Sequence, residues 1–573
     1  MNMGRFNLVD EPWIPVETRD GTGALVSLSG VFDRSREIAR IGGEVPTQSF
    51  AVLGLLSSVL RRVMVRSWSP TLSAQDIQIG HRAKPWGIGE WEQVAEDPDA
   101  AIETVLDYLD EFHDRFDLRD PERPFYQVAD LRTGKGEYSG LEVLLADVPN
   151  GEPFFTTRLR EGNRRISWAE AARWLVHVQA FDPSGIRSGA VGDPRVKGGK
   201  GYPIGAGWAA QIGGLVVDRD SLWDTLLTNL VPNGVGGLSF DETTDLPPWE
   251  RPQLSEQEEA RGGRDPRGPV DLATWQSRRV RLVGSDEGVV GIVLCQGDRV
   301  TPQFRQHLEP RTAWRYSEPQ TKKAGTIVYM PQELDPARSL WQGLEALLPG
   351  TSPQDPRVKV SKAPRQIPPA LSEWLEKLIE AGFLSAQDIR YHATGVKLGS
   401  NNSVIVELLD DSVVLPRAVF EPQQENLRNR VVDAARLAQD LARELGYFAA
   451  NLARAAGADS TDGEEARARE QMIAAVAPEF AQWVVDVSPE TIGADRVEWA
   501  TRLWRLSEDE AQVLIAGIPP EAFEGRATSR GDMDAGLAEV YFRSRRHKLG
   551  VDPRPTTTDM TPTHQGEEGD PHE

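Results

Sequence analysis

Cysteine and histidine are scarce in this sequence. Cys295 is the one cysteine in 573 residues, so the chain cannot close a disulfide within itself or build a zinc site from cysteine ligands. It lies in the apolar segment GVVGIVLC, which predicts a small, buried strand residue. The eight histidines are scattered, and no two have the three- or four-residue spacing that lets one helix face bind a metal. We therefore expect neither a metal nor a cofactor.

Long apolar runs and a signal peptide are also missing. The longest apolar stretch, residues 51–65, is too short to cross a bilayer and contains Arg61 and Arg62. The first residues hold no cationic segment followed by an apolar run. We expect a cytoplasmic protein that has no membrane partner.

Basic residues are too few to balance the acids. Lysine and arginine number 64 against 87 aspartates and glutamates, for a formal net charge of −23 at pH 7. This excess disfavours a protein that coats nucleic acid over its whole surface, because such binding depends on cations that neutralise phosphates. A local nucleic-acid site and partners with basic faces remain compatible with it.

One segment, residues 183–208, departs from this acidic background: PSGIRSGAVGDPRVKGGKGYPIGAGW. It holds eight glycines, and its only acid is Asp193; its cations are Arg187, Arg195, Lys197 and Lys200. Glycines lack a Cβ, so the backbone amides can approach a phosphate or a nucleic-acid groove, and the cations would attract it. A flexible surface linker is the alternative, although the interleaved aromatic and β-branched residues do not suit a plain linker. No glycine segment has Walker spacing.

A second cationic segment, RLREGNRR at residues 158–165, precedes a helix expected at 167–180. That helix ends where the glycine-rich segment begins. Two basic loops that flank one helix predict a face for duplex DNA. A solvated arginine cluster without a ligand is equally compatible with the composition.

Length and periodicity predict an α+β protein of more than one domain. Residues 1–420 are expected to form a mixed α/β domain. We predict a strand pair at residues 7–17 and 24–32, a buried helix at 47–65, an acidic helix at 92–116 and a helix at 167–180 capped by Ser167.

The spacing of apolar residues changes in the C-terminal part of the chain. Apolar residues recur every three or four positions from residue 426 onward, and four such segments predict a four-helix bundle at residues 425–551, with Pro478 kinking or dividing its second helix. Residues 552–573 are acidic and lack an apolar cluster, so we expect a disordered tail.

A hairpin is predicted at residues 391–409, YHATGVKLGSNNSVIVELL. β-Branched and apolar residues flank the turn GSNNS, in which glycine and asparagine tolerate positive φ. Turn chemistry alone explains these residues. The residues themselves thus leave open an ordinary hairpin and a tip that contacts a ligand.

Five segments follow one another along the chain in a recognisable order: NLVDEPWIPV, FDPSGIRSGAVGDPRVKGGKGYPIG, TWQSRRVRL, TAWRYSEPQTKK and GSNNS before a strand. In this order they resemble the CasA family, the large subunit of the type I-E CRISPR surveillance complex Cascade, over nearly the whole chain. The resemblance implies a non-catalytic subunit that recognises a protospacer-adjacent motif in double-stranded DNA through the minor groove. It also implies that the subunit helps open the duplex for R-loop formation and recruits the helicase-nuclease.

The resemblance also implies which residues contact the DNA motif: Ser184, Gly185, Arg187, Arg305, Asn401 and Asn402. Ser184 and Gly185 are alternatives for the closest approach of the family's glycine loop. Arg305 corresponds to the family's basic finger, and Arg311 is the second candidate for that role. Asn401 would contact the motif, and Asn402 stands where some relatives carry a longer glutamine that wedges between base pairs.

A further set is implied to anchor the subunit to the guide CRISPR RNA and the other Cascade subunits: Phe154, Phe155, Arg158 and Arg160. Some relatives carry a cysteine cluster suggestive of zinc, which this chain cannot form. Two other classes of function stay open, a nucleotide-binding enzyme that uses the glycine-rich loop and a pure protein–protein adaptor.

Overall fold

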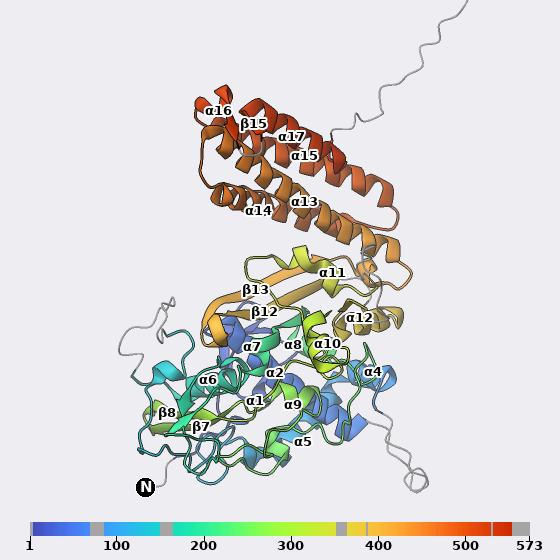
Figure 1. The fold of residues 1–573 in the computed structure, drawn as a ribbon. Coiled ribbons are helices and arrows are strands. Elements are labelled where there is room, and N and C mark those ends of the chain that lie inside the picture. Colours follow the sequence, from blue (N-terminus) through green and yellow to red (C-terminus); the bar gives the residue numbers. More distant parts are fainter. Residues whose placement is uncertain are drawn as a thin grey trace, which may run out of the picture. The chain divides into compact units, whose positions relative to one another are not determined.

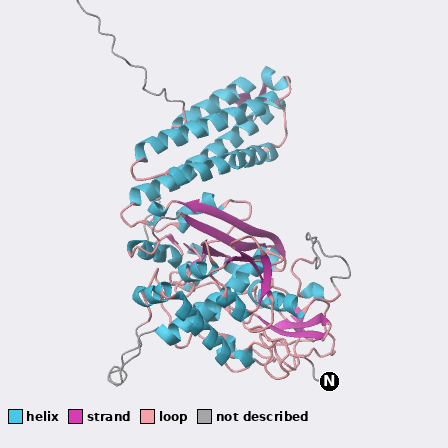
Figure 2. Ribbon diagram, turned by 180° about the vertical axis from the view of Figure 1, so that it is seen from behind, coloured by secondary structure: helices cyan, strands magenta, loops and turns pink. Residues whose placement is uncertain are grey.

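The computed structural model describes residues 4–68, 85–148, 164–350, 364–384, 388–528 and 531–552 (Figure 1). The chain divides into two compact units, Met1–Glu425 and Asn426–Glu573. The first mixes helices with small sheets and the second is mainly helical, so the expected α+β class with a C-terminal helical bundle is confirmed (Figure 2).

Most of the helices described in the first unit are short. They are α1 (Leu28–Asp33), α2 (Pro46–Val63), α4 (Ile88–Glu96), α5 (Pro98–Glu111), α6 (Trp168–Phe181), α7 (Trp208–Ile212), α8 (Leu222–Thr228), α9 (Pro269–Ala273), α10 (Glu318–Ala324), α11 (Leu344–Leu347) and α12 (Ala370–Glu380).

Helix α2 lies in the core of this unit. With the π-helical turn after it, Pro46–Trp68, it is long and apolar enough to cross a membrane, but 78% of its most apolar window is buried inside the protein. Its two arginines have internal partners. Arg62 forms an ion pair with Glu250 at 2.7 Å, and Arg61 donates to the Val231 carbonyl at 2.5 Å. These contacts satisfy cations that would otherwise be costly to bury.

The strands of the first unit form several small sheets. They are β1 (Ile14–Thr18), β2 (Gly23–Val26), β3 (Ile38–Ile41), β4 (Arg187–Ser188), β5 (Lys200–Gly201), β6 (Gly214–Asp218), β7 (Arg278–Ser285), β8 (Gly288–Gln296), β9 (Trp314–Tyr316), β10 (Tyr329–Pro331), β11 (Gln366–Ile367), β12 (Ile389–Leu398) and β13 (Ile405–Leu415). The three-stranded sheets have the orders β2-β1-β3, β10-β9-β11 and β13-β12-β6, and β4-β5 and β7-β8 are two-stranded.

Two sheets position the candidate site. The predicted hairpin at 391–409 is present as β12 and β13, which pair from Ile389 with Leu415 to Leu398 with Ile405. Strand β6 joins the other edge of β12, antiparallel. Strands β7 and β8 pair along their length, and Cys295 of β8 is buried as expected.

Three predicted elements differ from the structure. The first strand, expected at 7–17, begins only at Ile14 and ends at Thr18. The expected helix at 92–116 is wrong in extent: α4 and α5 are separate, because the Asp97 side chain caps α5 by accepting from the Ala100 N–H and Pro98 begins the helix. The expected second strand at 24–32 ends at Val26, and α1 follows because Ser27 caps it.

Within residues 426–528 and 531–552, the second unit has four long helices and a small hairpin. They are α13 (Glu425–Ala456), α14 (Asp462–Asp486), α15 (Ile492–Ala516) and α17 (Ala535–Lys548), with the short α16 (Glu521–Glu524) and strands β14 (Arg526–Thr528) and β15 (Gly531–Met533). Pro478 lies inside α14 without dividing it. Trp483 and Trp499 pack in the core with ring centroids 5.0 Å apart.

Candidate nucleic-acid interface

The glycine-rich segment is a closed loop in the structure. It leaves α6, whose first turn is capped as predicted by the Ser167 side chain accepting from the Glu170 N–H. The Gly207 N–H donates to the Asp182 carbonyl at 2.9 Å, so the two ends of the loop meet before α7 begins. A Cβ on Gly207 would lie 2.4 Å from the Ala180 carbonyl oxygen, which explains the glycine there. These contacts argue against the flexible-linker alternative.

The centre of the loop is a tight hairpin. Strands β4 and β5 pair through Arg187 with Gly201 and Ser188 with Lys200. Between them the peptide groups of Lys197 and Lys200 exchange both hydrogen bonds at 3.1 Å. Gly198 and Gly199 have φ of +58° and +73°, the two positive values of a two-residue type I′ turn. The turn therefore sets two lysines side by side.

The four cations of the loop fall into two pairs. Arg187 forms an ion pair with Asp182 at 2.8 Å, and Arg195 with Asp193 at 2.9 Å. Arg195 also donates to the Gly297 carbonyl at 2.9 Å. Both guanidinium groups thus hold the loop together, and Arg187, predicted to contact DNA, is already engaged within the protein.

Lys197 and Lys200 form the other pair. Both are exposed, and neither has an ion-pair partner among the residues that the structure describes. Like charges directly opposite each other in an antiparallel pair are unfavourable. A phosphate backbone would relieve this repulsion.

The predicted hairpin tip touches the glycine loop. The Ser184 N–H donates to the Asn402 carbonyl at 2.7 Å. This bond brings together two segments that are distant in sequence and that the family resemblance assigns to the same DNA motif. Ser184 is buried by the contact, whereas Gly185 beside it is half-buried.

The tip presents two asparagine side chains. Asn401 and Asn402 have left-handed backbones, with φ of +58° and +55°, as the turn chemistry predicts. Both are exposed, and their side-chain amides make no hydrogen bond within the described ranges. An amide can both donate and accept, so each is free to meet a base edge.

The basic-finger candidates are less accessible. The Arg305 guanidinium forms an ion pair with Asp265, and its side chain is 13% exposed. Arg311 stacks over the Phe50 ring at 4.9 Å and lies 3.7 Å from Glu309. Neither extends freely into solvent in this conformation, so either would have to leave its partner to reach DNA. The basic-finger assignment stays a prediction.

The predicted anchoring residues Phe154, Phe155, Arg158 and Arg160 lie outside the described residues. Described structure resumes at Arg164, and the neighbouring Arg165 forms an ion pair with Glu287.

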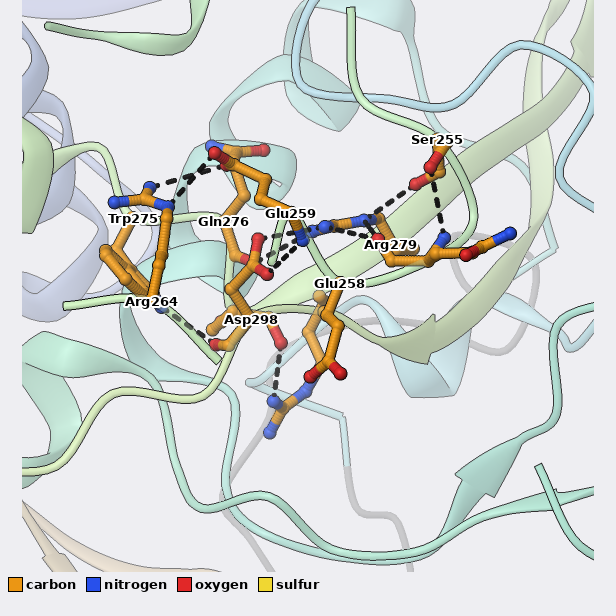
Figure 3. Close-up of polar contacts among 12 residues, drawn as sticks. Ser255, Glu258, Glu259, Arg264, Trp275, Gln276, Arg279 and Asp298 are labelled. Carbon is orange, nitrogen blue, oxygen red and sulfur yellow. Dashed lines mark hydrogen bonds and ion pairs between the residues drawn. The ribbon is translucent and has the colours of Figure 1, made fainter. Parts of the chain in front are cut away.

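A polar network, largely buried, contacts the glycine-rich loop through Glu258 and Arg195; Figure 3 shows its labelled members. Arg279 and Asp298, both almost fully buried, pair at 2.8 Å. Arg279 also donates to the Ser255 carbonyl at 2.8 Å, and Asp298 accepts from the Glu259 N–H at 2.8 Å. The network fixes the acidic segment around Glu258, which in turn lies 3.4 Å from Arg195 of the glycine loop. The charges of Arg279, Asp298 and Glu258 thus all have partners within the protein, which favours one arrangement of this segment.

A histidine clamp stabilises the hairpin sheet. His392 of β12 lies between Asp218 of β6, with Nδ1 3.3 Å from the carboxylate, and Asp410 of β13, with Nε2 2.5 Å from the carboxylate. The bond to Asp218 and then that to Asp410 raise the pKa of His392 to about 9, against partial burial. The protonated ring therefore links all three strands at neutral pH.

Other titratable side chains are structural. Burial lowers the pKa of His177 to about 4 and raises the pKa of the Cys295 thiol to about 12, so both are neutral. His113, which Asp114 follows in the sequence, lies 2.7 Å from Asp10. No group of three or more potential metal ligands occurs in the part of the chain that the structure describes.

Sequence reasoning missed two residues that shape the loop, Arg278 and Gln296. Both lie on the β7–β8 hairpin and reach the loop from far away in the sequence. No local pattern signals such a contact.

Comparison with known proteins defines the class of this chain as CRISPR-associated. The family model for CRISPR-associated protein Cse1 matches residues 7–509. CasA/Cse1 of Thermus thermophilus is 30% identical over 461 residues, 79% of each chain. The chain therefore belongs to the Cse1 (CasA) family.

Solved structures agree with this assignment. Cse1 of Thermobifida fusca is 38% identical, with a TM-score of 0.84 over 96% of this chain and 98% of that one. A chain of a solved CRISPR RNA-guided surveillance complex shares the fold at 17% identity, with a TM-score of 0.67 over 95% of this chain and 99% of that one.

Proposed function

We propose that this chain is the large, non-catalytic subunit of a CRISPR RNA-guided surveillance complex. It recognises a short motif in double-stranded DNA through the minor groove, helps open the adjacent duplex and recruits the helicase-nuclease. Its partners are the other subunits, the guide CRISPR RNA and the target DNA. Family membership and the shared fold of a chain from such a complex support this proposal.

The observation that carries the proposal is the 2.7 Å bond from the Ser184 N–H to the Asn402 carbonyl. It joins a glycine loop and a hairpin tip into one surface with free amide groups and an exposed lysine pair. The minor groove offers a degenerate row of acceptors, and small backbone and amide donors suit it better than a recognition helix does. Sequence beyond the motif is read by guide pairing.

Duplex opening is assigned to the hairpin tip. A wedge costs a few kcal/mol of base unstacking, which guide pairing and phosphate contacts must offset. Asn402 is short for a wedge, so opening here depends more on the combined loop and tip than on one side chain.

The test is target binding by the reconstituted complex. A library of duplexes with a randomised motif beside a guide-matched sequence should yield a preferred motif set, and affinity should fall steeply with salt because counterions are released. Loss of this preference when the subunit is omitted completes the assignment. Magnesium-dependent nucleotide turnover by the pure chain would instead favour the enzyme alternative, and binding without motif or salt dependence would favour the adaptor.

Anchoring to the complex is a separate part of the proposal. Phe154 and Phe155 are proposed to bind the guide RNA or a neighbouring subunit, where a stacked base contributes about 1–3 kcal/mol. Replacing both by alanine should release the subunit during gel filtration of the complex. Full incorporation of the double variant would remove them from the anchor.

A further inference from the structure

We propose that Gln296 is a positioning residue for motif recognition: it holds the Gly185 carbonyl inward and thereby aims the Ile186 N–H at the DNA. This inference rests on the proposed function and adds a residue that does not itself touch DNA. It extends the site to the last residue of β8, on a sheet separate from the loop.

The side-chain amide of Gln296 bridges the two ends of the loop hairpin. Its Nε2 donates to the Gly185 carbonyl at 2.8 Å and to the Gly201 carbonyl at 3.3 Å. Gly185 precedes β4 and Gly201 ends β5, so one amide fixes both. The side chain is 3% exposed, and a Cβ on Gly201 would lie 2.9 Å from its Cγ. The loop needs glycine there to approach it this closely.

Arg278 holds the neighbouring carbonyls in the same way. Its guanidinium is fully buried, pairs with Asp182, and donates to the Pro183 carbonyl at 2.9 Å and the Gly205 carbonyl at 3.0 Å. Burial lowers the pKa of Arg278, although nearby Asp182 opposes the shift, and arginine stays charged in any case. Buried donors thus bind loop carbonyls on the inner side.

The geometry of a planar trans peptide predicts which backbone N–H groups of the loop face outward. In one peptide unit the C=O and the next residue's N–H point in opposite directions. The Pro183 carbonyl is held inward, and the Ser184 N–H accordingly points away and reaches Asn402 at the hairpin tip. By the same geometry, the inward Gly185 carbonyl turns the Ile186 N–H outward.

The Ile186 N–H is available for a ligand. It donates no hydrogen bond within the described ranges, and Ile186 is 54% exposed. An unpaired N–H two residues from the contact between Ser184 and the hairpin tip suits an acceptor on DNA, either a minor-groove base edge or a phosphate oxygen. Motif and non-motif duplexes distinguish the two, since only a base contact changes the preference.

The test compares Gln296→Met with a matched control, Gln127→Met, in the assembled complex. Gln127 is also 3% exposed, and its side chain makes three hydrogen bonds to the backbone, so its loss costs at least comparable stability. We expect Gln296→Met to lower the ratio of motif to non-motif binding about tenfold, a change of about 1.4 kcal/mol. Gln127→Met should leave the ratio unchanged.

A ratio that stays at the wild-type value in Gln296→Met overturns the inference, and so does an equal fall in the control. Wild-type complex without any motif preference would instead refute the proposed function. Hydrogen exchange on the wild-type complex gives a second measurement that needs no variant. The Ile186 amide should exchange rapidly in the free complex and become protected by motif DNA; absence of that protection also overturns the inference.

Discussion

Substitutions at the hairpin tip can separate the chemistry of the asparagine side chains from the shape of the turn. Asn401 and Asn402 both have left-handed backbones. Replacing both by glycine keeps that backbone accessible and removes the amides. Replacing both by alanine removes the same amides but strains the turn, since the left-handed region costs alanine about 1–2 kcal/mol more than glycine, and alanine lacks the local hydrogen bonding that lets asparagine adopt it. The two double variants are therefore matched in lost chemistry and differ in shape.

The expected magnitudes follow from these contacts. A hydrogen bond contributes about 0.5–1.5 kcal/mol net, so loss of one from each amide should weaken binding to a closed duplex about 5- to 150-fold. Relative to the glycine variant, the alanine variant carries about 2–4 kcal/mol of strain, which should displace the Asn402 carbonyl from the Ser184 N–H. It should bind more weakly still. The glycine variant should keep a melting temperature close to wild type, because the tip is exposed and its amides have no internal partner among the described residues. The alanine variant should melt at a lower temperature because of its strained turn.

The assay compares two targets for each variant, a closed duplex and one with an open bubble beside the motif. If the tip helps separate the strands, each variant should lose much less affinity for the bubble target than for the closed duplex, since the base pairs beside the motif are already open in the bubble target. Equal losses on both targets would mean general DNA contact. Wild-type binding by the glycine variant with weak binding by the alanine variant would show that only turn shape matters, and the reasoning about amide contacts would be wrong.

Three other variants test the lysine pair, the glycine loop and the histidine clamp of the hairpin sheet. Lys197→Gln with Lys200→Gln should lower the slope of log affinity against log salt by about 2, roughly one unit per phosphate contact, while Lys322→Gln with Lys323→Gln on α10 should leave it unchanged. Gly185→Asp should abolish target binding without unfolding, because its Cβ would meet only the flexible tip of Arg187, at 2.8 Å, whereas its carboxylate would repel phosphate; binding at the level of Gly185→Ala would contradict this. The pKa of His392 is raised to about 9 from its ordinary value of 6.5, so its contribution to stability is complete below about pH 6.5 and is lost as pH rises through about 9. His392→Asn should flatten the dependence of melting temperature on pH over that range, and an unchanged profile would exclude the clamp.

The elements that sequence predicted correctly have local signals. Helix α6 begins at a serine cap whose partner stands three residues later, and the β12–β13 turn is built from residues that accept positive φ. The helix expected at 92–116 also had a local signal, the Asp97-Pro98 pair that ends α4 and begins α5, but the acidic amphipathic pattern concealed it. The pairing of β6 with β12 could not be predicted, because it depends on a partner strand distant in sequence.

In the candidate site, too, contacts with distant segments could not be predicted, and they decide which cations are free. Counting cations in residues 183–208 suggested four groups for DNA, but the partner of Arg187 is Asp182, one residue before that segment, and Arg195 also lies near the distant Glu258. Only the lysine pair keeps its charge exposed. A composition count cannot make this distinction, because an ion pair depends on which distant segment folds against the loop.

The orientation of the loop's peptide groups depends even more on residues that are distant in the sequence. Glycines permit many orientations of residues 183–186, and their abundance alone does not say which amides face outward. That choice is made by Arg278 and Gln296, which bind the carbonyls from the opposite side. On the proposed function, a change in Gln296 should therefore alter motif preference while every residue proposed to face the DNA stays the same. The specificity of this surface would then be encoded partly by buried side chains on a neighbouring sheet.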